Sequence, residues 1–165
     1  DFRSVMPTNL YGPGDNYHPE DSHVMASLIR KFYLASKYSH SKVTCWGTGS
    51  PFREFMHVDD LGDAVIFVLE NWNPELENAP RDKEGNPLSI LNVGTGNDLS
   101  IKELAHLIAK LTNFKGEIIW DLSKPDGTPK KLLNIKQIKK IGWEPKINLK
   151  IGLQRTIKDF SLENN

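Results

Sequence analysis

The sequence predicts a small α/β domain built from short strands and helices of moderate length. Strand-like and helix-like hydrophobic patterns alternate along the chain, which favours this class. The 165 residues suffice for one domain with a sizeable core and are too few for two ordinary domains. The 38% hydrophobic and 25% charged composition is typical of a globular protein. Too few strand–helix units are present for a complete doubly wound sheet.

The chain opens with a short apolar strand at residues 2–6. A polar stretch rich in glycine and proline follows at residues 7–24, and a loop of that length in a compact domain usually has a function. A helix is expected over residues 22–39, because apolar residues recur at helical spacing from Val24 to Ala35.

The middle of the chain holds a strand at residues 43–46 and an extended segment at residues 53–58. A glycine turn joins the two. Asp59 or Asp60 is then expected to cap a helix whose apolar face extends over residues 61–72.

The last part of the chain begins with a proline-rich loop at residues 73–87 and a buried strand at residues 88–93. Ser100 and Glu103 form a capping box for the next helix, which turns apolar residues inward as far as Leu111. Four shorter elements complete the chain: a strand at 117–120, a loop at 123–129, a short helix at 135–140 and an amphipathic helix at 149–160.

Composition excludes several classes of partner. The 21 basic and 21 acidic residues give zero net charge, so there is no electrostatic case for nucleic acid. No apolar run is long enough to cross a bilayer, so a membrane is not an expected partner. The lone Cys45 excludes an intramolecular disulfide framework and fits a reducing cytoplasm. The first residues have neither an initiator methionine nor a signal-peptide pattern.

Basic residues gather in the segment 124–158. One interpretation is a solvated lysine surface, and the other is that cations near Lys130 and Lys131 meet an anionic ligand. The loop at 124–131 has the same two interpretations, a turn with flanking charges or a polar clamp over a sugar nucleotide.

Trp46 and Arg53 form a second candidate for ligand binding. An aromatic face and a guanidinium close together accept a base and a phosphate respectively. The alternative is a core tryptophan with a surface arginine, and the two residues alone do not decide between them.

The glycine-rich turns are expected to be structural. Gly94-x-Gly96 follows a strand and precedes a helix, as in a dinucleotide-binding turn. However, Leu99 occupies the place of the third glycine, and no acidic residue stands at a suitable later strand end. This segment and the turn at residues 47–50 are therefore predicted to hold no cofactor phosphate.

Among the histidines, His23 is the candidate for chemistry. His18 and His23 are separated by Pro19, which prevents a helix from joining them, and no metal site is predicted. His57, beside two aspartates, is expected to make a structural contact. His23 ends the polar loop, where a histidine serves either as a general acid or base or as a helix cap.

Four segments, taken in order, resemble the C-terminal part of the GDP-L-fucose synthase family. They read "RSVMPTNLYGPGDNYHPEDSHV", "VTCWGTGSPFREFMHVDDLGDA", "LNVGTGNDLSIKELA" and "SKPDGTPKKLLN". This family comprises the NADPH-dependent GDP-4-keto-6-deoxymannose 3,5-epimerase/4-reductases of the extended short-chain dehydrogenase/reductase group. "PTNLYGP" and "REFMHVDD" indicate only that wider group, whereas "DNYHPEDSHV" with "SKPDGTPKKLLN" is more specific.

The resemblance implies a set of site residues. His23 matches the family histidine that acts as an acid in epimerisation and lies beside the cofactor. The residues matching those that contact the nicotinamide end of NADP(H) are Pro7, Thr8, Asn9 and Leu10. Those matching the substrate-contacting residues are Lys31, Trp46, Arg53, Asp126 and Lys131. At position 31 the family often has arginine, so the charge is kept but the bidentate fork is not.

The resemblance also implies a division of the chain. Residues 1–22 would hold the end of the last Rossmann strand and the active-site loop, and residues 23–165 the GDP-sugar-binding domain. The Rossmann domain would be largely missing, with the Ser-Tyr-Lys triad and the catalytic cysteine upstream of Asp1. Cys45 lies in the wrong place to be that cysteine. The intact enzyme would be a homodimer, and this chain alone would be inactive.

The mechanism implied for the intact enzyme has two stages. A base removes the proton alpha to the 4-keto group and His23 delivers one to the opposite face, so that C3 and C5 invert. Hydride transfer from NADPH to C4 follows. Two alternatives stay open: the substrate domain of another sugar-nucleotide epimerase, reductase or dehydratase of the group, and a stand-alone nucleotide-sugar binding module.

Overall fold

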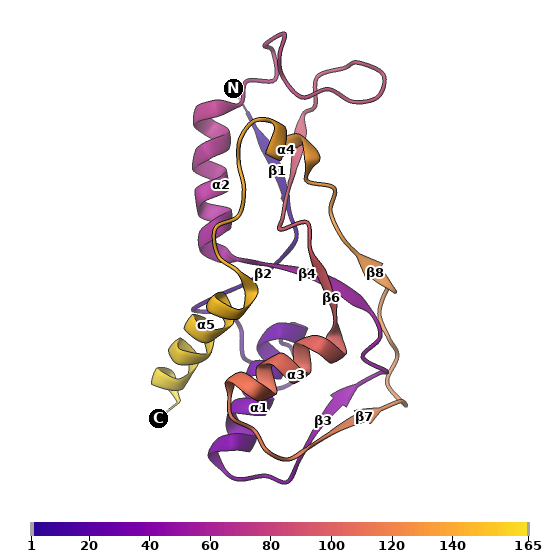
Figure 1. Ribbon diagram of the computed structural model, residues 1–165, viewed down its shortest axis with the longest axis vertical. Helices are drawn as coiled ribbons and strands as arrows, with labels where there is room; N and C mark the ends of the chain where they lie inside the picture. The colour runs from indigo at the N-terminus through magenta and orange to yellow at the C-terminus, as the bar shows by residue number, and fades with distance from the viewer. Residues whose placement is uncertain (1, 165) are drawn as a thin grey trace.

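The computed structural model describes residues 2–164, which form two lobes stacked along the long axis of the molecule (Figure 1). The strands are β1 (Ser4–Pro7), β2 (Asn9–Tyr11), β3 (Lys42–Trp46), β4 (Phe52–His57), β5 (Ile90–Val93), β6 (Asp98–Ser100), β7 (Glu117–Asp121) and β8 (Lys130–Lys131). The helices are α1 (Val24–Lys37), α2 (Val58–Asn71), α3 (Ile101–Leu111), α4 (Lys136–Lys140) and α5 (Leu149–Glu163).

The predicted α/β class is confirmed, and the predicted helices and longer strands are present within a few residues of their expected bounds. Three short strands, β2, β6 and β8, were not predicted. Each pairs with β4, which is distant from all three in sequence. Because such strands exist through long-range pairing rather than through an apolar run, their own residues carry little signal.

The strands form small sheets rather than one continuous sheet. β1 pairs in parallel with β5, and β3 pairs in parallel with β7. β4 lies between them in the middle of the molecule (Figure 1) and has parallel partners in β2 and β8 and an antiparallel partner in β6. β4 is therefore the element that connects the two lobes.

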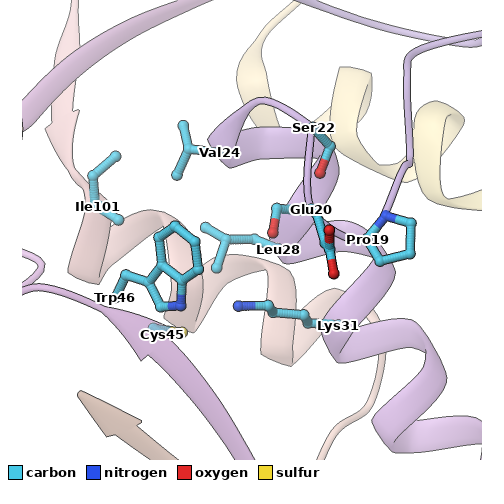
Figure 2. Close-up of a pocket in the computed structure, with 10 residues that line it drawn as sticks. Pro19, Glu20, Ser22, Val24, Leu28, Lys31, Cys45, Trp46 and Ile101 are labelled. Carbon is cyan, nitrogen blue, oxygen red and sulfur yellow. The ribbon is translucent and has the colours of Figure 1, made fainter. Parts of the chain in front are cut away.

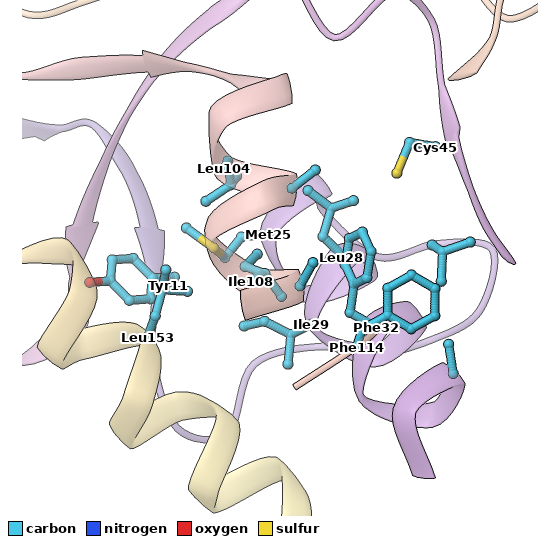
Figure 3. Close-up of a cluster of buried hydrophobic side chains, with 14 of the residues drawn as sticks. Tyr11, Met25, Leu28, Ile29, Phe32, Cys45, Leu104, Ile108, Phe114 and Leu153 are labelled. Carbon is cyan, nitrogen blue, oxygen red and sulfur yellow. The ribbon is translucent and has the colours of Figure 1, made fainter. Parts of the chain in front are cut away.

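Each lobe has its own hydrophobic cluster. In the lower lobe of Figure 1, α1, α3 and α5 pack together around side chains such as Phe32, Ile108 and Leu153, which Figure 3 shows pointing toward one another. In the upper lobe, Leu91 of β5 and Val68 of α2 pack with residues near α4. None of the helices in the described part of the chain is long and apolar enough to cross a membrane.

β4 contributes to both clusters because successive strand residues face opposite sides. Phe55 belongs to the lower cluster and Met56 to the upper one. Glu54, which faces the same side as Met56, is completely buried. A buried carboxylate requires hydrogen-bond donors, and the surrounding loops supply them.

The Glu54 side chain accepts hydrogen bonds from two separate segments. Its Oε1 accepts from the backbone N–H groups of Thr95 (2.6 Å) and Gly96 (2.7 Å), and its Oε2 accepts from the N–H of Leu133 (2.9 Å). Gly94 has to be a glycine here, because a Cβ would lie 2.4 Å from Glu54 Oε1. One side chain thus holds the turn after β5 and the segment before α4 against β4.

The helix caps are partly as expected. The capping box of α3 is confirmed: Ser100 Oγ accepts from the Glu103 N–H, and Glu103 Oε2 accepts from the Ser100 N–H. The predicted cap of α2 by Asp59 or Asp60 is wrong. β4 runs directly into the helix, so His57 is the cap, and its Nδ1 accepts from the Asp59 N–H at 3.2 Å.

We expect Glu54→Gln to lower the free energy of unfolding by about 2–4 kcal/mol, because the amide replaces an acceptor by a donor and leaves a buried N–H group unpaired. Urea unfolding of the protein measures this change. Glu70→Gln, at an exposed position of α2, is the matched control and is expected to change the value by less than about 0.5 kcal/mol. Equal effects of the two substitutions would show that the Glu54 bonds contribute little.

Candidate functional site

The first part of the site lies where β1 ends. Pro7 closes β1, and the chain continues into β2, so the predicted loop at residues 7–24 contains a three-residue strand. Thr8 Oγ1 (3.2 Å) and Asn9 Nδ2 (2.8 Å) both donate to the backbone carbonyl of Glu54. Leu10 is 36% exposed. The segment is therefore fixed by its polar side chains and presents an apolar one to solvent.

The remainder of the loop leads to His23 and is organised by local hydrogen bonds. His18 Nδ1 accepts from the N–H groups of Glu20 and Asp21, which gives His18 a structural role. His23 is the N-cap residue of α1 by its extended backbone, but its side chain makes no capping hydrogen bond and is exposed. Of the two roles left open for His23, capping by the imidazole ring is not the one that this geometry uses.

A pocket of about 200 Å³ opens at the start of α1 (Figure 2); Ser22 and Val24, the chain neighbours of His23, line it, but His23 itself does not. It lies between the end of the polar loop, the first turns of α1, and β3. Its lining residues are Pro19, Glu20, Ser22, Val24, Ser27, Leu28, Lys31, Cys45, Trp46 and Ile101. Two of the predicted substrate-binding residues, Lys31 and Trp46, therefore share one cavity, and the neighbours of His23 on both sides line it.

Trp46 is not a core tryptophan, because its side chain is 62% exposed. Figure 2 shows the Lys31 side chain extending toward the indole. Lys31 Nζ lies 5.6 Å from the ring centroid and donates to the Thr44 carbonyl at 3.1 Å, and Lys124 Nζ lies 5.4 Å from the same ring. Both distances fall within the range of cation–π attraction.

Cys45 forms part of the pocket wall but is not a reactive thiol. Its side chain is buried, and burial raises the pKa of the thiol despite an opposing effect of the Lys31 charge. A thiol with a raised pKa is a poor base or nucleophile at neutral pH. The expectation that Cys45 is not the catalytic cysteine agrees with this environment.

Arg53 and Lys131 lie side by side on a second part of the site. They are register partners in the parallel pair of β4 and β8. Arg53 Nη1 donates to the carbonyl oxygens of Phe52 (2.7 Å) and Thr128 (2.6 Å). Neighbouring like charges repel, so this pair is favourable where an anion lies between the two cations.

Asp126 is held by a loop that the sequence did not indicate as functional. Its Oδ1 accepts from the Thr48 N–H (2.9 Å) and its Oδ2 from Thr48 Oγ1 (2.7 Å). Gly47 allows this approach, because a Cβ there would lie 2.2 Å from Asp126 Oδ1. Thr48 carries no sequence signal, since its partner is distant along the chain.

The turn at Gly94–Gly96 is already occupied by an internal carboxylate. The N–H groups of Thr95 and Gly96, which would face a phosphate in a dinucleotide turn, donate to Glu54. This geometry gives a physical reason for the prediction that the turn is structural. Within residues 2–164, no cluster of three or more His, Cys, Asp or Glu side chains is arranged to hold a metal ion.

The sequence contains two Tyr-x-x-x-Lys spacings, a pattern typical of reductases in this group, that were not among the candidates named above. In both pairs the structure gives the residues structural roles. Tyr33 packs edge to face against Phe160 with 5.4 Å between ring centroids, and Lys37 donates to a carbonyl at the end of α5. Tyr38 ends α1, and Lys42 begins β3. Neither pair lines the pocket beside His23.

The comparisons with known proteins agree with this geometry. Residues 1–80 match the model of the NAD dependent epimerase/dehydratase family. Over 158 residues the chain is 49% identical to a probable GDP-L-fucose synthase 1 from Oryza sativa subsp. japonica, covering 96% of this chain and 44% of that protein. It is also 49% identical over 165 residues to the GDP-L-fucose synthase of Escherichia coli (strain K12), covering 99% and 50%.

Solved structures have the same fold. A GDP-6-OMe-4-keto-L-xylo-heptose reductase from C. jejuni superposes with a TM-score of 0.86 at 31% identity, covering 99% of this chain and 54% of the reductase. An NADP-bound GDP-L-fucose synthetase from Naegleria fowleri gives 0.82 at 27% identity, covering 99% and 47%. The chain thus spans about half the length of the curated relatives it matches. By sequence and fold the chain is a homologue of the GDP-L-fucose synthases, and its residues 1–80 match the NAD dependent epimerase/dehydratase family.

Proposed function

We propose that this chain supplies the substrate-binding part of an NADP(H)-dependent GDP-4-keto-6-deoxymannose 3,5-epimerase/4-reductase that makes GDP-L-fucose. The observation that carries the proposal is how the cations of the site are held. Lys31 donates to the carbonyl of Thr44, and Arg53 donates to two carbonyls. A neutral acceptor orients a cation without cancelling its charge, so both charges stay available to a diphosphate.

The pocket beside His23 supports a nucleotide-sugar as the ligand. The exposed indole of Trp46 offers a face for an aromatic or sugar ring, and Lys31 and Lys124 add positive charge on it. We propose that Arg53, Asp126 and Lys131 extend this binding surface beyond Trp46. The related proteins compared above have names that specify GDP-sugars.

The nicotinamide end of NADP(H) is proposed to lie against Pro7, Thr8, Asn9 and Leu10, with His23 nearby. Ligands of open α/β sheets bind beyond the carboxyl ends of parallel strands, and this segment follows the carboxyl end of β1 beside the parallel β5. The exposed Leu10 side chain suits an apolar ring face. When bound, NADPH supplies the hydride that reduces the C4 carbonyl.

In the proposed epimerisation, His23 holds a proton and delivers it to the face of the sugar opposite to the base. Its exposed ring, which is not engaged in capping, suits this role. The base and the Ser-Tyr-Lys triad are not assigned to any residue of this chain, and we expect the isolated chain to be inactive. A homodimeric enzyme and a cytoplasmic location, which suits the reduced Cys45, belong to the same proposal.

For the division of the chain, we propose residues 1–22 as the end of the last Rossmann strand with the active-site loop, and residues 23–165 as the GDP-sugar-binding domain. The packing in the upper lobe supports one refinement. β5 pairs with β1, and α2 shares a hydrophobic cluster with β5. We therefore propose that α2 and β5, although they fall within residues 23–165, lie on the Rossmann side of the site.

A second candidate is another reductase or epimerase acting on a GDP-sugar. The chain is 32% identical to a GDP-L-colitose synthase from Yersinia pseudotuberculosis over 164 residues, and this observation favours that alternative over more distant ones. A stand-alone nucleotide-sugar binding module remains the alternative from a different class, and reduction of a 4-keto sugar by the protein would exclude it.

The proposal predicts that the protein binds GDP-sugars in preference to UDP-sugars. Isothermal titration with GDP-4-keto-6-deoxymannose or GDP-L-fucose, against UDP-glucose, measures the preference, which we expect to be at least roughly tenfold. A preference for the UDP-sugar would overturn the assignment to fucose synthesis.

His23→Asn is expected to slow epimerisation by roughly 10²–10⁴-fold, because a general acid is lost, with little effect on NADPH binding. Deuterium exchange at C3 and C5 of the sugar, followed by NMR in the enzyme that contains this chain, measures the first effect, and fluorescence titration measures the second. His106→Asn, on the exposed face of α3, is the control. Equal loss of both properties in His23→Asn would make the residue structural.

Arg53→Ala is expected to weaken GDP-sugar binding by about 1.5–3 kcal/mol, because charge-assisted hydrogen bonds to the diphosphate are lost. Titration with GDP-L-fucose measures the change. Arg53→Lys, which keeps the charge but not the planar guanidinium, is expected to lie between Ala and wild type. An affinity unchanged in Arg53→Ala would return this residue to the role of a surface charge.

A further inference from the structure

Residues 122–129, here called the strap, run beside residues 46–53, the segment that links β3 to β4 (Figure 1). Three alternate residues of the strap contact this segment in succession. Lys124 Nζ lies over the Trp46 ring, Asp126 accepts from Thr48, and the Thr128 carbonyl accepts from Arg53. Proposed substrate-binding residues therefore stand at both ends and in the middle of one line of contacts.

The middle contact joins the two segments most specifically. Both carboxylate oxygens of Asp126 are bonded to the backbone and hydroxyl of Thr48. The same hydroxyl is 2.7 Å from Ser50 Oγ and accepts from the Ser50 N–H at 3.1 Å, which fixes its rotamer. Positive φ at Gly47 (72°) and the absence of a Cβ there allow the carboxylate to approach.

The two flanking contacts, Lys124 with Trp46 and Arg53 with Thr128, hold the strap less specifically than the bond between Asp126 and Thr48 does. The Lys124–Trp46 contact is a cation–π interaction between exposed groups, and the bond to the Thr128 carbonyl comes from Arg53, a side chain that is itself proposed to bind the ligand. Gly127 packs against Arg53, since a Cβ at that position would lie 2.9 Å from Nη2. The far end of the strap is also held by the Phe52 N–H, which donates to the Pro129 carbonyl at 2.8 Å, and by the pairing of β8 with β4. The bond between Thr48 and Asp126 is therefore the contact that fixes the middle of the strap.

We infer that Thr48 is a positioning residue for the substrate: by holding Asp126 it fixes the middle of the strap, and with it the placement of Asp126 and Lys124 around a GDP-sugar. This inference rests on the proposed function and adds to it a residue that does not itself touch the ligand. It accounts for the contact of Gly47 and Thr48 with Asp126, which is far from both in the chain.

The test is a double-mutant cycle in the active enzyme that contains this chain, with Thr48→Val, Asp126→Asn and the two combined. Thr48→Val keeps the shape of the side chain and removes its hydroxyl. We expect it to raise KM for the GDP-sugar roughly tenfold, with kcat and KM for NADPH changed by less than about twofold. The double variant is expected to be no worse than Asp126→Asn, because both substitutions break the same contact.

Two further variants separate positioning from general damage. Thr48→Ser, which restores the hydroxyl, is expected to return KM to within about twofold of wild type. Thr112→Val removes a threonine hydroxyl that bonds to carbonyls at the end of α3, away from the strap, and is the matched control with wild-type KM.

An unchanged KM in Thr48→Val, or full additivity with Asp126→Asn, would overturn this inference and leave the proposed function standing. Failure of the wild-type enzyme to turn over any GDP-sugar would instead overturn the proposed function, and this inference with it. A fall in kcat and a rise in both KM values together would show that Thr48 has only a structural role.

Discussion

The buried carboxylate of Glu54 is the interaction on which the arrangement of the site depends. Its side chain accepts hydrogen bonds from the turn after β5 and from the segment before α4, while its backbone carbonyl accepts from Thr8 and Asn9. A carboxylate removed from water is tolerated only when donors surround it, so these segments cannot move independently. The end of β1, which is proposed to face the cofactor, and the cation-bearing strand β4 are consequently held together at Glu54, in addition to the pairing of β2 with β4.

β4 can serve both lobes because its side chains alternate between two clusters. This alternation is visible in the sequence as an extended segment, and the capping box of α3 is equally visible because Ser100 and Glu103 are neighbours on one turn. The strands β2, β6 and β8 are not visible, because each is defined by its pairing with β4 rather than by its own composition. The cap of α2 was missed for the same reason: it is His57, the last residue of β4, and not an aspartate of the helix.

The family resemblance indicated candidate site residues from the sequence, whereas a contact between two distant loops carries no sequence signal. The family pattern indicated Lys31 and Trp46, which the structure brings into one pocket, and Arg53 and Lys131, which it brings into register. Their roles toward a ligand remain predictions. Thr48 was missed for a physical reason: a hydroxyl in a glycine turn is ordinary until the fold places Asp126 against it.

The positions of the chain's own carboxylates determine which cations and N–H groups are left to bind an anionic ligand. In the glycine turn after β5, the Glu54 carboxylate occupies the N–H groups that a phosphate would otherwise use. Lysines elsewhere are also neutralised locally, as Lys130 is by Asp98 (3.0 Å) and Lys146 by Asp63 (2.7 Å). Lys31 and Arg53, by contrast, are oriented by carbonyl groups that leave their charge intact. Because an oriented but uncompensated cation gains most from an external anion, the surface between the pocket and the strap is where the proposed ligand would place its negative charge.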